Sequence, residues 1–242
     1  MVSPRTLDDA AAVELPDGPD PASLDPSVRL AIGRAWIEHA ASERAEAASL
    51  AHVAAIVLAR GASPDLCWLA VRAASDELRH AALCVRVARA YDPSHDRLPE
   101  ARLFTSTAVA VPEQHAPALR VVAQCCVQET LAAAYLERAY ADAVEPLPRA
   151  VLRLLLGDEI DHGRIGYAFA ATLSDAERAA LRAPLATLLE RCVDTWRTRA
   201  RALPSIPAPE HGVLAAATIE QTIEDALEHL ILPGLREVGL RA

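Results

Sequence analysis

The chain has 242 residues, of which 52% are hydrophobic and 24% are charged. This length suits one domain with a core several helices deep, and the charged content argues against a wholly disordered chain. The formal net charge of −9 disfavours nucleic-acid or anionic-membrane binding as the main task. All 24 basic residues are arginines, which excludes lysine Schiff-base chemistry and a phosphate loop that needs its lysine.

The five cysteines form no C-x-x-C pair, which disfavours a structural zinc site and a thioredoxin-type motif. Their odd number indicates reduced thiols, so we expect a cytoplasmic protein. Asp8, Asp9 and Glu14 stand where a signal peptide would need an apolar run. The longest helical stretch without a charged residue, 47–59, is too short for a membrane span, and we expect no membrane partner.

Residues 1–25 are rich in proline and aspartate and lack periodicity, so we predict a flexible tail. Four helices follow, each bounded by proline, glycine or capping signals: residues 26–61, 63–91, 117–143 and 149–172. The connection between the second and third helices is too long for a tight turn. Two closely linked helix pairs joined by a long connection predict an all-α four-helix bundle with a crossover.

Beyond the bundle, Ser174 and Glu177 form a capping box that predicts the start of a fifth helix, ending near residue 202. A proline-rich loop precedes a sixth helix, which we expect to end at Leu232 before Pro233. We therefore predict three parts: a tail over 1–25, a bundle over 26–173 and a helical extension over 174–242 packed on the bundle.

The sequence D-E-x-x-H occurs twice, at Asp76–His80 and at Asp158–His162. Residues three apart on a helix share a face, so the Glu and His of each copy can hold one ion. A single E-x-x-H is weak evidence, but two copies that share the preceding Asp argue against coincidence.

A wider repeat surrounds these motifs. Glu46 lies 31 residues before Glu77, and Glu129 lies 30 residues before Glu159. Helices of similar length joined by short turns place such residues at one level of a bundle. The result is four carboxylates and two imidazoles from four helices, the ligand set of a carboxylate-bridged di-metal site. The predicted metal ligands are Glu46, Glu77, His80, Glu129, Glu159 and His162.

The predicted ligands lie on apolar helix stripes, where solvated charges do not belong. Burying four carboxylates unpaired would cost several kcal/mol each, whereas two divalent cations balance their charge. Ion pairs are the alternative, but no arginine occupies a matching position. Glu43 would sit about 4.5 Å along the axis from Glu46, so we expect it beside the metal ligands or at the site entrance and not on the metal. For His39 a place beside the ligands is the alternative, and we prefer a polar end of the bundle.

Glu46, Glu77-x-x-His80, Glu129 and Glu159-x-x-His162 resemble the ferritin-like superfamily of non-haem di-iron proteins over residues 27–173. The resemblance implies a ferritin-like bundle, two iron ions and O2 activation, and manganese suits similar ligands. It also implies that Asp76 and Asp158 orient the opposite histidines. Cys84 stands where ribonucleotide reductase small subunits carry a tyrosine, which disfavours a tyrosyl radical.

The leading hypothesis is a di-iron oxidase or oxygenase that uses O2 to oxidise a small organic substrate. We expect a separate electron donor, because no flavin, nicotinamide or iron–sulfur motif is present, and we consider a homodimer. Ala132, Ala133 and Gly166 would leave room for O2 or substrate. The alternatives are a ferroxidase or iron-storage protein without an organic substrate and, third, a metal-free interaction protein.

Overall fold

A computed structural model describes residues 13–20, 23–101, 109–202 and 206–241. Over these ranges the regular structure is helical, and the one β-type pairing is an isolated bridge between Ala208 and Val213. The prediction of an all-α fold is confirmed. No helix in the described part of the chain has the length and apolar character needed to cross a bilayer.

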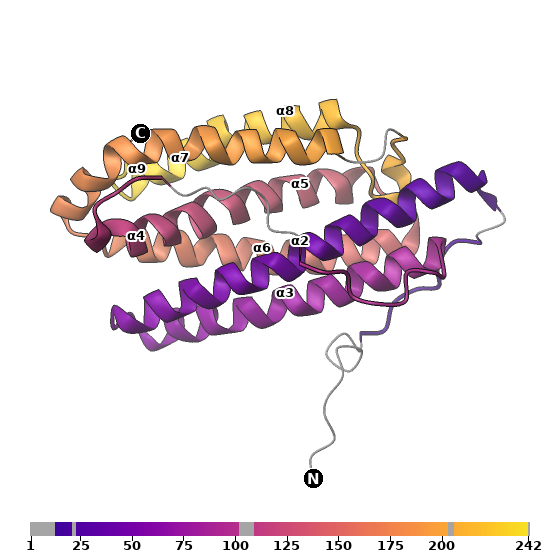
Figure 1. The fold of residues 1–242 in the computed structure, drawn as a ribbon, viewed down its shortest axis with the longest axis horizontal. Coiled ribbons are helices and arrows are strands. Elements are labelled where there is room, and N and C mark those ends of the chain that lie inside the picture. The colour runs from indigo at the N-terminus through magenta and orange to yellow at the C-terminus, as the bar shows by residue number, and fades with distance from the viewer. Residues whose placement is uncertain (1–12, 21–22, 102–108, 203–205, 242) are drawn as a thin grey trace, which may run out of the picture.

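Helices α2 (Pro26–Ala59) and α3 (Pro64–Tyr91) form the first pair, and they lie side by side along their length (Figure 1). Both begin as the sequence predicts. The side chain of Asp25 caps α2 by accepting a hydrogen bond from the Ser27 amide, and Ser63 caps α3. Gly61, with φ of +68°, provides the left-handed residue of the turn between them.

The third helical segment is not one regular α-helix. It consists of α4 (Ala116–Val121), a π-helical turn η3 (Val122–Gln128) and α5 (Glu129–Asp142), preceded by a short 3₁₀ turn, η2 (Glu113–His115). At the end of η3 the amide of Glu129 bonds to the carbonyl of Gln124, five residues earlier. The segment pairs with α6 (Pro146–Ala171). The sequence predicted the helix but not its π turn.

The C-terminal extension comprises α7 (Asp175–Ala202), a 3₁₀ turn η4 (Pro209–His211), α8 (Ala216–Ala226), a π turn η5 (Leu227–Ile231) and α9 (Leu232–Glu237). The predicted capping box is present: the Ser174 amide donates to Glu177 over 2.8 Å. The prediction that the last helix ends at Leu232 is wrong. Pro233 falls in the first turn of α9, where its missing N–H costs little.

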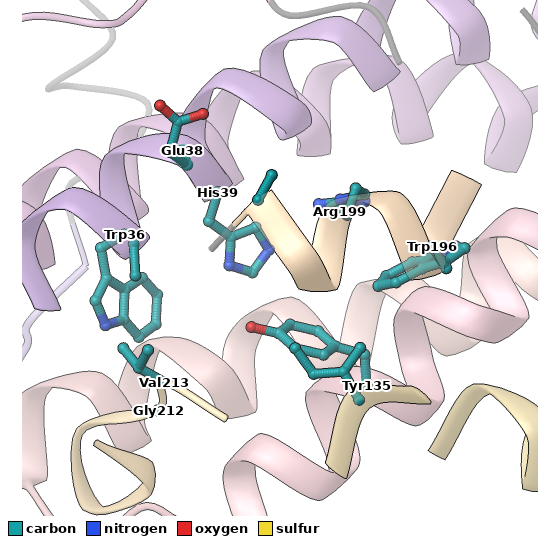
Figure 2. Close-up of a pocket in the computed structure, with 11 residues that line it drawn as sticks. Trp36, Glu38, His39, Tyr135, Trp196, Arg199, Gly212 and Val213 are labelled. Atoms are coloured by element: carbon teal, nitrogen blue, oxygen red, sulfur yellow. The ribbon is translucent and has the colours of Figure 1, made fainter. Parts of the chain in front are cut away.

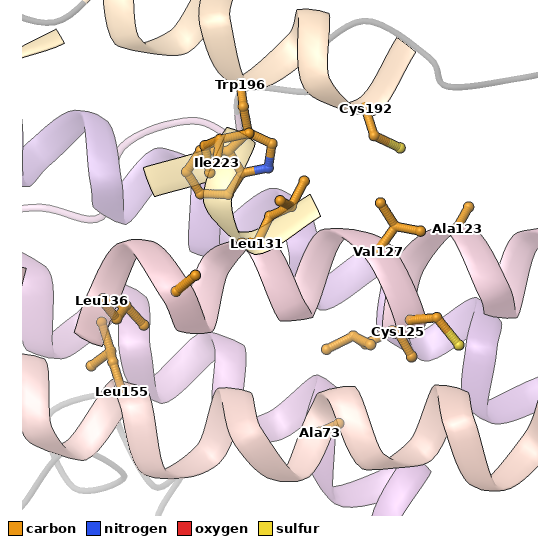
Figure 3. Packing of buried hydrophobic residues seen from close by; sticks show 14 of the residues in the cluster. Ala73, Ala123, Cys125, Val127, Leu131, Leu136, Leu155, Cys192, Trp196 and Ile223 are labelled. Atoms are coloured by element: carbon orange, nitrogen blue, oxygen red, sulfur yellow. The ribbon is translucent and has the colours of Figure 1, made fainter. Parts of the chain in front are cut away.

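The extension shares the core of the bundle. Figure 3 shows Cys192 and Trp196 of α7 facing Val127 and Leu131 on the third segment, and all four are buried. The indole nitrogen of Trp196 donates to Oε1 of Gln128 over 2.8 Å. Helix α7 therefore covers a side of the third segment that a free four-helix bundle would expose to water.

Of the predicted tail, residues 1–12 and 21–22 lie outside the described residues. Residues 13–20 lie against α3. The side chain of Arg86 donates to the carbonyl of Val13 over 3.1 Å, and a Cβ at Gly18 would lie 2.7 Å from Cβ of Ala90. This part of the expected tail is packed on the bundle.

Candidate metal centre

Buried glutamates and histidines from α2, α3, α5 and α6 meet in one cluster. Two groups of possible ligands have all their donor atoms within 4.8 Å of one another: Glu43, Glu77, His80 and Glu159, and Glu77, Glu129, Glu159 and His162. Glu77 and Glu159 belong to both groups. The cluster could therefore hold two cations, with the carboxylates of Glu77 and Glu159 common to both groups.

Each histidine turns its Nδ1 atom toward the carboxylates. Nδ1 of His80 lies 3.3 Å from Oε1 of Glu159 and 3.5 Å from Oε2 of Glu77. Nδ1 of His162 lies 3.0 Å from Oε1 of Glu77 and 3.2 Å from Oε2 of Glu159. Both imidazoles are fully buried, and their ring centroids are 6.0 Å apart. The Glu and His of each motif thus share a helix face directed at the same interior point.

The opposite ring nitrogens face aspartates of the other motif. Nε2 of His80 lies 3.1 Å from Oδ2 of Asp158, and Nε2 of His162 lies 3.6 Å from Oδ2 of Asp76. Burial alone would raise the pKa of each aspartate. Contacts with the histidine and with nearby arginines outweigh that effect and hold both pKa values below the ordinary range.

Two arginines hold this pair of aspartates on its outer side. Arg72 donates to Oδ2 of Asp76 over 3.0 Å, and Arg79 donates to Asp158 and, over 3.4 Å, to Asp76. The arginines therefore pair with the aspartates behind the histidines. Among the described residues, the ion pairs of the four clustered glutamates are to histidines, so ion pairing with arginine does not account for their burial.

The four glutamates are in different electrostatic environments. Burial, reinforced by the charge of Glu159, raises the pKa of Glu77 and of Glu129 well above the ordinary value. Burial acts on Glu43 and Glu159 too, but His39 holds the pKa of Glu43 well below its usual range. His162 and His80 lower the pKa of Glu159 to about 2. Without a cation, the cluster must share protons among carboxylates that repel one another.

Four polar atoms of the cluster make no hydrogen bond among the described residues: both carboxylate oxygens of Glu77, Nδ1 of His80 and Nε2 of His162. A buried carboxylate without a partner is costly, and a cation bound between the carboxylates removes that cost. Carboxylate oxygens and imidazole nitrogens suit iron and manganese. The residues present therefore fit two divalent metal ions.

On α2 the structure differs from the sequence expectation. Glu43 belongs to the cluster, and Glu46, predicted as the ligand, does not enter either group. Oε2 of Glu46 accepts a hydrogen bond from the Gln124 amide over 2.7 Å, and the same nitrogen donates to Oε1 of Glu129 over 2.6 Å. The spacing argument assumed equivalent halves, but Glu129 directly follows a π turn that has no counterpart in α2.

The other predicted residues lie close to the cluster in different roles. Cys84 is fully buried but outside both groups, and burial raises the pKa of its thiol. Gly166 does not leave free space, because a Cβ there would lie 2.5 Å from the amide nitrogen of Cys126. Ala132 lines a cavity of about 20 Å³ beside the glutamates, and Ala133 is not among its lining residues.

Sequence reasoning preferred a polar end of the bundle for His39 over a place beside the metal ligands, and it missed Gln124 as a neighbour of the glutamates. His39 stands four residues before Glu43, a spacing that places both on one helix face, so a signal was present. Gln124 stands five residues before Glu129, and that spacing brings side chains together only in a π turn.

Comparison of the chain with protein-family models, with curated proteins and with solved structures gave no match. The geometry of the cluster and of its surroundings is therefore the basis for a functional proposal.

Proposed function

We propose that the protein is a ferritin-like non-haem di-iron oxidoreductase that uses O2 to oxidise a small organic substrate. The observation that carries this proposal is the sharing of Glu77 and Glu159 between two buried ligand groups. Shared carboxylates with one histidine on each side are typical of di-metal sites built within helix bundles.

In this proposal Glu43 and His80 would hold one metal ion, Glu129 and His162 would hold the other, and Glu77 and Glu159 would be available to both. Iron bound there supplies the redox chemistry needed to activate O2. Asp158 accepts a hydrogen bond from Nε2 of His80, and Asp76 faces Nε2 of His162 at 3.6 Å. The two negative charges favour the proton on Nε2 and leave Nδ1 as the metal-binding nitrogen. Leu136 and Ala132 line the adjoining cavity.

Iron oxidation or storage without an organic substrate would use the same ligands. One observation favours the oxidoreductase: Trp196 and Arg199 of α7 line the cavity beside the glutamates, so the C-terminal extension reaches the site. A storage site needs no such additional lining. The proposed reaction also requires electrons from a separate donor protein or cosubstrate.

The test is anaerobic loading of metal-free protein with ferrous iron, followed by elemental analysis and O2-uptake measurement. We expect two irons per chain, and loss of iron in Glu77→Ala and Glu159→Ala but not in Glu137→Ala, a control at an exposed position of α5. O2 uptake should stop once the bound iron is oxidised and resume when a reductant is added. Uptake of many irons per chain would favour storage, and absence of bound iron or manganese would contradict both metal functions.

A further inference from the structure

A second cavity adjoins the one beside the glutamates. This outer pocket has a volume of about 60 Å³ and is lined mainly by aromatic residues and by the C-terminal extension (Figure 2). Four residues line both cavities: His39, Tyr135, Trp196 and Arg199. Because these four side chains line both cavities, the outer pocket lies next to the cavity beside the carboxylate cluster.

Aromatic rings form a nearly continuous wall around the outer pocket. Trp36 stacks on His39 with ring centroids 5.8 Å apart, and His39 meets Tyr135 edge-on at 5.9 Å. Tyr135 in turn lies 5.7 Å from Trp196. Figure 2 shows the hydroxyl end of Tyr135 directed toward the space between the Trp36 and His39 rings. Such walls favour a flat, apolar molecular body that stacks on them.

One positive side chain accompanies these rings. Among the described residues that line either cavity, Arg199 is the only arginine. Its guanidinium lies over the Trp196 ring, 4.5 Å from the centroid. The carboxylate of Glu38, which also lines the pocket, points away from the rings in Figure 2. A guanidinium has five N–H donors, which lets it bind a carboxylate with two parallel hydrogen bonds while keeping other contacts.

The wall contributed by the C-terminal extension is held in place. The indole nitrogen of Trp36 donates to the carbonyl of His211 over 3.0 Å, and the Tyr91 hydroxyl lies 2.8 Å from Nδ1 of His211. Gly212 has φ of +79°, and a Cβ there would lie 3.0 Å from Cζ2 of Trp36. The backbone thus packs directly on the indole, which holds this wall of the pocket in position.

From these contacts we propose that the outer pocket is the substrate site and that it takes a small aromatic carboxylate. The ring of the substrate stacks among Trp36, Tyr135 and Trp196, and its carboxylate binds Arg199. The assignment of the pocket as a substrate site rests on the proposed oxidoreductase function. The class of ligand follows from the pocket itself and is testable with or without metal.

The test uses three probes: benzoate, its neutral analogue benzamide, and cyclohexanecarboxylate, which has the charge without the flat ring. Each is titrated against metal-free and iron-loaded full-length protein by calorimetry, with tryptophan fluorescence as a second signal. We expect benzoate to bind at least about tenfold more tightly than benzamide, because a charge-assisted pair replaces a neutral hydrogen bond. Benzoate should also bind more tightly than cyclohexanecarboxylate.

Arg199→Gln should remove the preference for benzoate over benzamide, and Arg199→Lys should retain part of it. Arg197→Gln is the matched control, because Arg197 lies on the same helix and does not line the pocket. Equal melting temperatures would show that the variants are folded.

Equal affinities for benzoate and benzamide, no binding of benzoate, or an unchanged preference in Arg199→Gln would each overturn the proposed ligand class. Metal content is measured separately. A protein that binds benzoate through Arg199 but holds no metal would retain the ligand assignment and lose the oxidoreductase function. A protein that holds two irons but does not bind benzoate would lose the ligand assignment and retain the proposed metal function.

Discussion

Nε2 of His39 lies 2.7 Å from Oε1 of Glu43, one helical turn further along α2. The same glutamate lies 3.5 Å from Nδ1 of His80 through its other oxygen. Glu43 is buried, so its carboxylate is fixed between a histidine of its own helix and the cluster. Glu46 is held by a hydrogen bond from Gln124 and belongs to neither ligand group.

Because Glu43 belongs to a ligand group and Glu46 does not, we predict different metal contents for the alanine variants of these two residues. Glu43→Ala should lose one of two metal ions per chain, because Glu43 belongs to only one of the two ligand groups. Glu46→Ala should retain both. Elemental analysis after equilibrium dialysis measures the content. Retention of both ions by Glu43→Ala together with loss from Glu46→Ala would instead favour the ligand assignment made from sequence spacing.

Asp158→Asn should weaken metal binding while leaving the fold intact. The amide keeps the shape of the side chain but removes the charge that faces Nε2 of His80, and such changes typically cost about 10–100-fold in metal affinity. Competition with a chelator measures the affinity. Asp161→Asn is the control, because Asp161 pairs with Arg72 and Arg164. Equal affinities of the two variants would contradict an orienting role for Asp158.

Gly166→Ala should destabilise the protein by about 1–3 kcal/mol, because the new methyl group would meet backbone atoms of Cys125 and Cys126 within 2.6 Å. Gly157→Ala on the same helix is a matched control, since nothing lies within 4 Å of its added Cβ. That variant should gain about 0.5–1 kcal/mol from helix propensity. Urea unfolding of the metal-free proteins measures both. Equal stabilities would mean that the π turn is not packed on Gly166.

Glu177 should contribute stability that depends on pH. Its carboxylate accepts hydrogen bonds from Arg60 over 2.7 Å and from the Ser174 amide over 2.8 Å. Arg60 first, and then Ser174, lower the pKa of Glu177 from 4.5 to about 2. A pKa that is lower in the folded state gives a contribution fully present above the unfolded value and lost as pH falls through the folded value.

We therefore expect Glu177→Gln to cost about 1 kcal/mol at pH 7, a value limited by the partial exposure of this cap and ion pair. The difference from the unchanged protein should shrink as pH falls from about 4.5 to about 2. Unfolding measured at several pH values gives the trend, with Glu190→Gln, at an exposed position of the same helix, as the control. A difference that stays constant down to pH 2 would contradict this account.

The sequence was informative about features that depend on residues close together in the chain, such as helix starts and the repeated motif. The capping residues Asp25, Ser63 and Ser174 set helix starts that the structure shares, and the two D-E-x-x-H motifs predicted a buried cluster of glutamates and histidines. Those features depend on residues close in the chain, whose relative positions on a helix are known in advance.

The sequence was uninformative where the rotation of a helix or long-range packing determines which side chains meet. Equal spacing to the motif glutamates indicates the level of Glu46 in the bundle, but not which side chain of α2 reaches the cluster. No local pattern indicates that Arg199 would line a cavity with His39, because α7 brings them together from 160 residues apart. The π turn likewise lacks a sequence signal such as proline or glycine.

The π turn at residues 122–128 has a consequence for how related chains are aligned. A π turn holds one more residue than an α turn, so the third helical segment contains the equivalent of a one-residue insertion. Removing one residue there would rotate Glu129 by about 100° relative to the preceding helix. Either Glu129 would no longer point into the cluster, or Cys125 and Cys126 would no longer pack against Gly166. A relative that lacks one residue in this stretch should therefore have a different metal site, however similar its D-E-x-x-H motifs.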